Sequence, residues 1–449
     1  MNSQTAHVSS RRFVYPGMLP PFILLVACFA AWGLAGNMTD PLVSVFGSVF
    51  SMSAFQSSLV QFAYYGAYFA LALPAAYINS KLGYKGGVLV GLALAATGGF
   101  LFFPAAKVMT YGLFILALFT LASGLSILET SANPYVMAMG PERNATRRLN
   151  FAQAFNPIGS NIGVFLAAMF ILPHVNPATA EERAAMSQEV LLSTRSAELQ
   201  AVMGPYLALA CLYLLLFIGI FITKVPPRRT IVSDAEAGIK REKGMFTRLL
   251  KNKRYSFGVV AQFFNIAAQT CIWTYTIHYV TEHLGLSKAE AGNWLQVSLI
   301  VFLVMRFLMV WIMGRVDSRH LMVTMCSLGA VLTLVAVVTG NIVGAICVVA
   351  LSACISLLFP TIYGIALAGL GDDTKYGAAG LVMAICGGAL MPLVQGRLID
   401  ATSAAFSYIV VLVCFLVIIG YGIYTLRIPA PQAMDEDEEM AAAASSHLH

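Results

Sequence analysis

Apolar runs long enough to cross a lipid bilayer recur along nearly the whole chain, with short polar turns between them. A transmembrane helix needs about 20 consecutive, mostly apolar residues. The sequence therefore predicts an all-α membrane protein. We place its twelve spans near 20–47, 55–79, 87–106, 111–139, 149–172, 203–223, 255–281, 290–314, 320–340, 343–370, 376–398 and 404–426.

The predicted spans fall into two sets of six, on either side of a polar connection at 224–254. The fourth span contains Pro134 and the tenth contains Pro360, and each is followed by a glycine, a charged turn and a glycine-containing span. This internal repeat predicts two pseudo-symmetric six-helix halves. We divide the chain into a cytoplasmic tail, a first bundle, a cytoplasmic linker, a second bundle and a disordered cytoplasmic tail, at 1–19, 20–223, 224–254, 255–427 and 428–449.

Basic residues lie mostly on one side of the predicted membrane. If the amino terminus is inside, the internal side receives the basic linker and Arg11, Arg12, Lys81, Lys85, Arg143, Arg147, Arg148, Arg315, Arg319, Lys375 and Arg427. The external side receives Lys107, Arg183, Arg195, Lys288 and Arg397. The positive-inside rule then places both termini in the cytoplasm. Twelve spans, internal termini and two parallel halves predict the major facilitator fold, with a substrate site near the midplane between the halves.

The composition supports a membrane protein. Hydrophobic residues make up 59% of the chain and charged residues 11%, and the mean hydropathy is +0.78, whereas a soluble domain usually has about 25% charged residues. The net charge of +6 follows from basic residues at the membrane edges. We therefore expect contact with membrane lipid and none with nucleic acid.

The sequence shows no pattern typical of a metalloprotein, a disulfide scaffold or an enzyme. All eight cysteines fall inside predicted spans and form no CxxC pair, which predicts neither a disulfide framework nor a zinc site. The first apolar run is too long for the core of a cleaved signal peptide, so we expect a retained span. Because phosphate-binding loops and nucleophile elbows are missing, we predict no enzymatic activity, no ATP-driven transport and no cofactor.

Two acidic residues interrupt otherwise apolar spans, Asp40 in the first and Glu129 in the fourth. A charge at the bilayer centre costs at least about 2.5–3.5 kcal/mol on insertion scales, so intramembrane acids usually face a cavity and commonly carry protons. Desolvation also favours the neutral, protonated carboxyl group. The two acids therefore predict a proton-coupled transporter.

The first span carries a polar face around its acid. Trp32, Gly33, Asn37 and Asp40 are spaced to share one side of the helix. Pro41 follows directly and should kink or break the helix, which frees backbone groups and is tolerated only beside a cavity. The structural alternative is a kink in which Asp40 caps the second half-helix.

Other spans carry amide and aromatic side chains at helical spacing. Together with one acid and one serine they form four sets, one in each span: Glu129 and Asn133; Asn150, Gln153, Asn156 and Ser160; Gln262, Asn265, Gln269 and Trp273; and Gln61, Tyr65 and Tyr68. Amides donate and accept hydrogen bonds, which suits a polyhydroxyl ligand, and aromatic rings pack on the C–H face of a sugar. The alternative is interhelical hydrogen bonding that holds the bundle together. We predict substrate contacts at Asn37, Gln61, Tyr65, Glu129, Asn133, Gln153, Asn156, Asn265, Gln269 and Trp273.

Arg306 is the one basic residue that we place within a span. It could pair with an acid in the cavity, but we expect it to snorkel to the nearby inner surface. His278 and His283 lie near the external end of the seventh span, and we expect them to titrate as surface groups.

Four segments resemble the L-fucose–proton symporter family of the major facilitator superfamily: Leu128–Val136, Arg148–Gly159, Ala261–Tyr275 and Gly371–Gly377. The resemblance implies that Asp40 and Glu129 are the protonation and sugar-coupling residues, and that Gln153 and Asn156 line the sugar cavity. The chain departs from the family's fucose transporter at Gly36 and Thr39, where that transporter is richer in asparagine. Because the family also carries glucose, galactose and N-acetylglucosamine, the choice of sugar stays open.

Together these features predict a monomeric symporter of the bacterial inner membrane that imports a monosaccharide such as L-fucose with a proton. An exporter of amphipathic compounds would use the same acids, but the amide stripe at 150–160 argues against it. A sugar sensor that binds without transporting also stays open.

Overall fold

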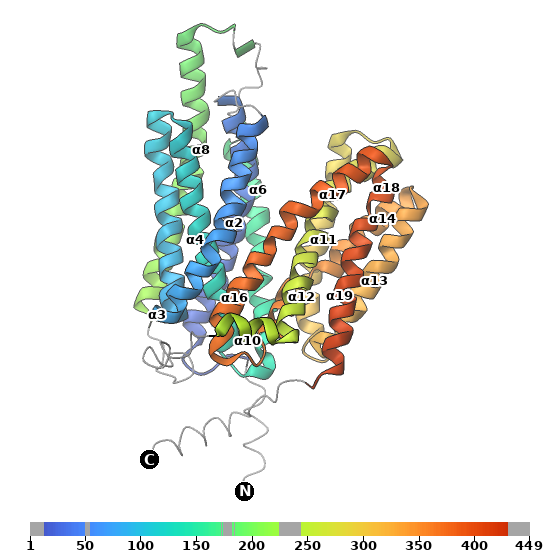
Figure 1. Cartoon of the computed structure of the whole chain (residues 1–449). Helices are drawn as coiled ribbons and strands as arrows, with labels where there is room; N and C mark the ends of the chain where they lie inside the picture. The colour runs from blue at the N-terminus through green and yellow to red at the C-terminus, as the bar shows by residue number, and fades with distance from the viewer. Residues whose placement is uncertain are drawn as a thin grey trace. The chain divides into compact units, whose positions relative to one another are not determined.

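The computed structural model describes residues 13–49, 54–171, 173, 182–183, 185–223 and 244–429, and helices account for nearly all of them. Figure 1 shows this all-helical chain. The expectations for both terminal tails and for most of the linker fall on residues outside this description. In the described part, ten helices are long and apolar enough to cross a membrane.

Two features reconcile these ten helices with the twelve predicted spans. Helix α3, Ala54–Val108, is 55 residues long and contains the second and third spans, joined at Gly83. Gly83 has a φ of 69°, in the left-handed region that favours glycine, and the helix kinks there. Helix α11, Lys253–Leu284, is the polar seventh span and is not among the ten. The structure therefore confirms an all-α architecture of twelve spans.

The described chain divides into two compact units. The amino unit comprises Leu19–Ala132 and Phe155–Val232, and the carboxyl unit comprises Met1–Met18, Asn133–Ala154 and Ser233–His449. The end of the fourth span and the start of the fifth thus belong with the last six spans. We describe each unit separately.

The amino unit is built from helices that pack through small residues. Its elements are α2 (Leu19–Val49), α3, most of α4 (Tyr111–Ala138), α6 (Asn156–Leu166), η2 (Ala167–Ile171) and α8 (Gln188–Ile222). A Cβ atom on Gly33 of α2 would overlap the carbonyl of Asn156, and one on Gly159 of α6 would overlap the carbonyl of Ala30. Helices α2 and α6 therefore approach so closely that only glycine fits at these two positions.

The carboxyl unit contains the remaining elements. They are η1 (Glu142–Asn144), α5 (Ala145–Gln153), α10 (Met245–Lys251), α11, α12 (Lys288–Ile312), α13 (Ser318–Thr339), α14 (Ile342–Ile355), α15 (Leu358–Leu367), η4 (Gly371–Asp373), α16 (Thr374–Met383), η5 (Ala384–Cys386), α17 (Gly387–Ala401), α18 (Ala404–Ser407) and α19 (Ile409–Arg427). Helix α11 packs against α12, α14, α15, α17 and α19 and forms the centre of the unit.

Several helices of this unit begin at residues that cap the first backbone amides and end at glycines. Ser287 and Glu290 form a reciprocal capping box at the start of α12, and Asn341 accepts from two backbone amides at the start of α14. Gly285 and Gly340 adopt left-handed φ values of 67° and 49° just after α11 and α13. The sequence thus fixes where these spans turn.

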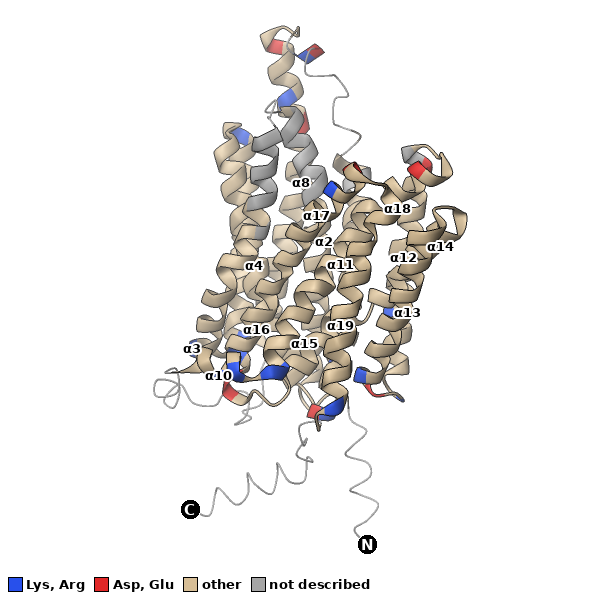
Figure 2. Cartoon of the chain, turned by 45° about the vertical axis from the view of Figure 1, so that its right-hand side comes forward, with Lys and Arg blue, Asp and Glu red and all other residues tan. Residues whose placement is uncertain are grey.

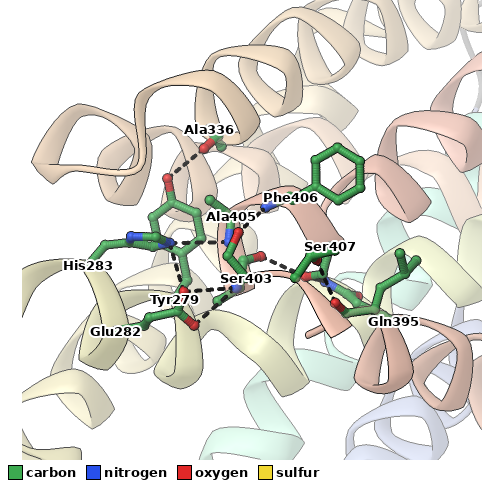
Figure 3. A network of polar contacts seen from close by, with 12 residues as sticks. Tyr279, Glu282, His283, Ala336, Gln395, Ser403, Ala405, Phe406 and Ser407 are labelled. Atoms are coloured by element: carbon green, nitrogen blue, oxygen red, sulfur yellow. Dashed lines mark hydrogen bonds and ion pairs between the residues drawn. The ribbon is translucent and has the colours of Figure 1, made fainter. Parts of the chain in front are cut away.

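The end of α11 is tied to the start of α18, as Figure 3 shows. The Glu282 carboxylate accepts from the backbone N–H of Ala404 at 3.0 Å, and Nε2 of His283 accepts from the N–H of Ala405 at 3.2 Å. The ring of His283 also lies 4.9 Å from that of Tyr279. His283 is therefore a partly buried packing residue, which corrects the expectation of a free surface group.

Charged side chains lie mainly at helix ends, and the helix middles carry few of them (Figure 2). Large apolar side chains on the outer helix faces are widely exposed, including Phe221 at 64%, Leu215 at 66% and Val338 at 75%. An exposed apolar surface of this kind is stable in contact with lipid tails rather than water.

Candidate functional site

Glu129 lies within α4 and is only 1% exposed. Neither oxygen of its carboxyl group has a hydrogen-bond partner among the described residues. An ionised carboxylate without partners in an apolar setting is strongly destabilised relative to the neutral acid. Glu129 is therefore a buried acidic residue that no described side chain or backbone group satisfies.

An aromatic cluster lies near this acid in the amino unit. The hydroxyl of Tyr68 accepts from Nε1 of Trp32 at 2.7 Å, and the Tyr64 ring lies 5.3 Å from the Tyr68 ring. The hydroxyl of Ser126, on α4 shortly before Glu129, donates to the backbone carbonyl of Tyr68 at 3.0 Å. Sequence reasoning missed Tyr64, although its spacing of four from Tyr68 was a usable signal.

Two predicted amides of the amino unit bond to the backbone of α2. Nδ2 of Asn37, an exposed side chain, donates to the carbonyl of Gly33 at 3.3 Å. Nδ2 of the half-buried Asn156 donates to the carbonyl of Phe29 at 3.3 Å, and Ser160 donates to that of Gly33 at 3.4 Å. These bonds support a helix-joining role for part of the fifth-span stripe, beside any contact with substrate.

Asn133 and Gln153 come together in the carboxyl unit. Nε2 of Gln153 donates to Oδ1 of Asn133 at 2.8 Å, and the two residues are 3% and 0% exposed, respectively. Nδ2 of Asn133 has no hydrogen-bond partner among the described residues. Leaving a buried amide donor without a partner costs about 1–3 kcal/mol of stability. Nδ2 of Asn133 is therefore suited to donate to a ligand hydroxyl or a water molecule.

Arg148 fixes α5 so that this pair can form. Its guanidinium is fully buried and donates to the carbonyls of Val136 at 2.7 Å, Gly140 at 3.0 Å and Phe13 at 3.0 Å, and also to that of Met137. All of these carbonyls except that of Phe13 belong to the end of α4 and the turn after it, where the last backbone acceptors of a helix lack internal partners. Arg148 therefore has a structural role in the motif at 148–159.

Helix α11 contributes two buried amides with unsatisfied polar atoms. Gln262 and Asn265 are both 0% exposed, and the nitrogen and oxygen of each side-chain amide have no hydrogen-bond partner among the described residues. Gln269 on the same helix is half-buried. The Gln262 and Asn265 amides therefore require a partner outside the described side chains, such as water or a ligand.

Trp273, farther along α11, is engaged within the carboxyl unit. Its Nε1 donates to Oγ of Ser352 at 3.1 Å, and its ring meets that of Phe302 edge to face at 5.0 Å. Ser352 in turn hydrogen-bonds Ser298 at 2.5 Å. These contacts link α11, α14 and α12, so Trp273 has a packing role whether or not it also contacts a substrate.

Three predicted site side chains, those of Asp40, Gln61 and Tyr65, lie outside the described residues. The backbone of α2 continues through Pro41 to Val49. The expected break therefore does not end the helix at Pro41.

Arg306 corrects another expectation. The residue is 5% exposed, so it does not snorkel to a surface. Its Nε donates to the carbonyl of Ser356 at 2.8 Å, and one terminal nitrogen donates to the carbonyl of Gln153 at 2.6 Å. In the described residues no group of three or more His, Cys, Asp or Glu side chains could hold a metal ion.

The comparisons with known proteins define the class. A model of the Major Facilitator Superfamily matches residues 22–385, so this chain belongs to that superfamily of multi-pass membrane transporters. A crystal structure of the transporter FucP in the outward conformation has a TM-score of 0.85 to this chain, with 34% sequence identity, and covers 91% of this chain and 99% of FucP.

Several curated relatives are similar over most of their length. The L-fucose-proton symporter of Haemophilus influenzae is 39% identical over 438 residues, which are 94% of this chain and 99% of that protein. The L-fucose-proton symporter of Escherichia coli K12 is 35% identical and covers 89% of this chain. The glucose/galactose transporter of Brucella abortus is 32% identical, also over 89% of this chain.

Proposed function

We propose that this protein imports a monosaccharide, with L-fucose as the first candidate, together with a proton across the bacterial inner membrane. The observation that carries this proposal is the buried carboxyl group of Glu129, which has no described hydrogen-bond partner in the middle of a transmembrane helix. Such a group is costly and marks proton or substrate pathways in membrane proteins. The similarity to L-fucose-proton symporters supports the choice of substrate.

In this proposal Asp40 and Glu129 carry the coupling proton. When the site faces the outside, each carboxyl group takes up a proton because desolvation favours its neutral form. Neutralisation removes the cost of moving a buried charge through the closed state. Each proton that moves down the membrane potential supplies about 2.3 kcal/mol per 100 mV, which drives sugar against its gradient.

The sugar contacts Glu129, Asn133, Gln153 and Asn156 in this mechanism. Nδ2 of Asn133 is a buried donor that no described residue satisfies, and a sugar hydroxyl can accept from it. We propose further contacts with Asn37, Gln61, Tyr65, Asn265, Gln269 and Trp273. Asn265 is the strongest of this group, because neither polar atom of its buried amide has a described partner.

Transport would proceed by rocking of two six-helix bundles at 20–223 and 255–427 around the loaded site. Both termini would lie in the cytoplasm, as the distribution of basic residues predicts. We propose that a monomer suffices, with the proton as the coupling ion and no further cofactor.

Counterflow of radiolabelled sugars in proteoliposomes tests the proposal. Vesicles preloaded with unlabelled L-fucose, D-galactose, D-glucose or N-acetylglucosamine should transiently concentrate the matching labelled sugar. We expect L-fucose to give the strongest signal. A sugar sensor would bind sugar without counterflow, and an exporter of amphipathic compounds would show neither property. Either result would overturn the proposal.

A further inference from the structure

Two helices of the carboxyl unit end at buried residues, and each is followed directly by a two-residue turn and another helix. Helix α5 ends at Gln153, and α14 ends at Ile355 before α15 begins at Leu358. The last carbonyls of a helix have no internal partner and carry the negative end of the helix dipole. Burial of two such ends therefore calls for a donor, preferably a cationic one.

Arg306 on α12 supplies that donor to both ends. Its Nε donates to Ser356 at 2.8 Å, directly after α14, and a terminal nitrogen donates to Gln153 at 2.6 Å, the last residue of α5. The guanidinium also lies over the ring of Phe302 at 4.8 Å. A planar group with several donors in fixed directions can bridge two carbonyls, which a lysine ammonium on a flexible chain does less well.

The Arg306 contact reaches the predicted sugar site through Gln153. The backbone carbonyl of Gln153 accepts from Arg306, and its side chain donates to Asn133 at 2.8 Å. Two more bonds hold α5 in place: Arg147 donates to the carbonyl of Val310 at 3.1 Å, and Asn150 donates to Thr361 at 3.2 Å. Of these three anchors, Arg306 acts at the end of α5 that carries Gln153, the partner of Asn133.

We propose that Arg306 is a positioning residue for sugar recognition: it docks the end of α5 onto α12 and α14 and so fixes the Asn133–Gln153 amide pair. This inference rests on the proposed function, in which that pair contacts the sugar. Arg306 itself need not touch the sugar, because both of its described hydrogen bonds go to backbone carbonyls.

A double-mutant cycle on sugar affinity tests the positioning role. Arg306→Lys keeps the charge but loses the bridge, so sugar should bind about tenfold more weakly, within the range for coupled neighbours. In a Gln153→Ala background the same change should cost no more than about twofold, because the amide to be positioned is gone. Arg315→Lys is the matched control, since Arg315 is exposed and lies over the Trp311 ring. An equal loss in both backgrounds would overturn the proposal.

Amide hydrogen exchange of the full chain in detergent gives a readout that needs no sugar. Arg306→Lys should speed exchange in peptides covering 145–153 and 350–358, and Arg315→Lys should leave both unchanged. If the wild type bound none of the four sugars, the proposed function would fail while this readout would still decide whether Arg306 docks α5. Unchanged exchange in the Arg306→Lys variant would refute the docking.

Discussion

The close approach of α2 and α6 predicts that Gly33→Ala destabilises the protein and weakens sugar binding together. A methyl group at position 33 would overlap the backbone carbonyl of Asn156, which can move away only if the α6 backbone moves. Overpacking of a tight core typically costs about 1–3 kcal/mol. Because α6 must shift away from α2, the side chain of Asn156 should move with it and lose part of its proposed contact with the sugar.

Gly204→Ala is a matched control for this substitution. Gly204 also lies within a helix, α8, but a Cβ atom there meets nothing within 4 Å. Both variants gain the helix propensity of alanine, roughly 1 kcal/mol, so the difference between them isolates the overlap. Thermal unfolding in detergent should give a lower midpoint for Gly33→Ala than for Gly204→Ala, with weaker binding of labelled sugar. Equal midpoints would refute the packing argument.

Three further predictions concern single side chains. Asn156→Ala should weaken sugar binding by about 1–3 kcal/mol; unchanged affinity with a lower unfolding midpoint would instead make Asn156 a helix-joining residue. Asp40→Asn fixes the neutral form of that acid and should allow counterflow while abolishing proton-driven accumulation; accumulation against a gradient would exclude Asp40 as a coupling residue. Burial alone would raise the pKa of Asp317, but hydrogen bonds from Arg319 outweigh it and hold this pKa below its usual range. These bonds stabilise the folded state by less than about 1 kcal/mol, because the pair is exposed. This stabilisation is present above the pKa of the unfolded chain, about 3.9, and is lost as the pH falls through the lower pKa of the folded state. Asp317→Asn should therefore lower the unfolding midpoint at neutral pH by an amount that shrinks below about pH 4; a gap independent of pH would contradict this assignment.

The fold was largely predictable because bilayer thickness sets a length that apolar runs must meet. That criterion located the spans, including the polar seventh one, α11, whose amides lower its hydropathy. It placed the second and third spans at 55–79 and 87–106 with a turn between them, and the structure has two helical segments that meet directly at a kink at Gly83. A single glycine with positive φ changes the helix direction without a loop, and an apolar pattern does not record this.

The candidate site was less predictable, because a sequence shows which faces are polar but not what each polar group bonds. Glu129 could be recognised from one chain, since an acid within an apolar span is costly wherever it points. Arg306 was wrongly expected to snorkel, because its partners are backbone carbonyls at helix ends that have no side-chain signature. The pairing of Asn133 with Gln153 depends equally on how Arg148 folds the turn between α4 and α5.

The central claim is that Glu129 carries a proton that moves with the sugar. The most direct test is a pH electrode trace in lightly buffered cells after a pulse of L-fucose, or of the sugar that gives counterflow. Wild-type protein and the control Glu189→Gln, which alters an exposed acid in the first turn of α8, should make the medium alkaline. Glu129→Gln mimics the protonated acid but cannot release a proton, so it should give no alkalinisation while retaining counterflow. A normal alkaline shift from Glu129→Gln would contradict the account.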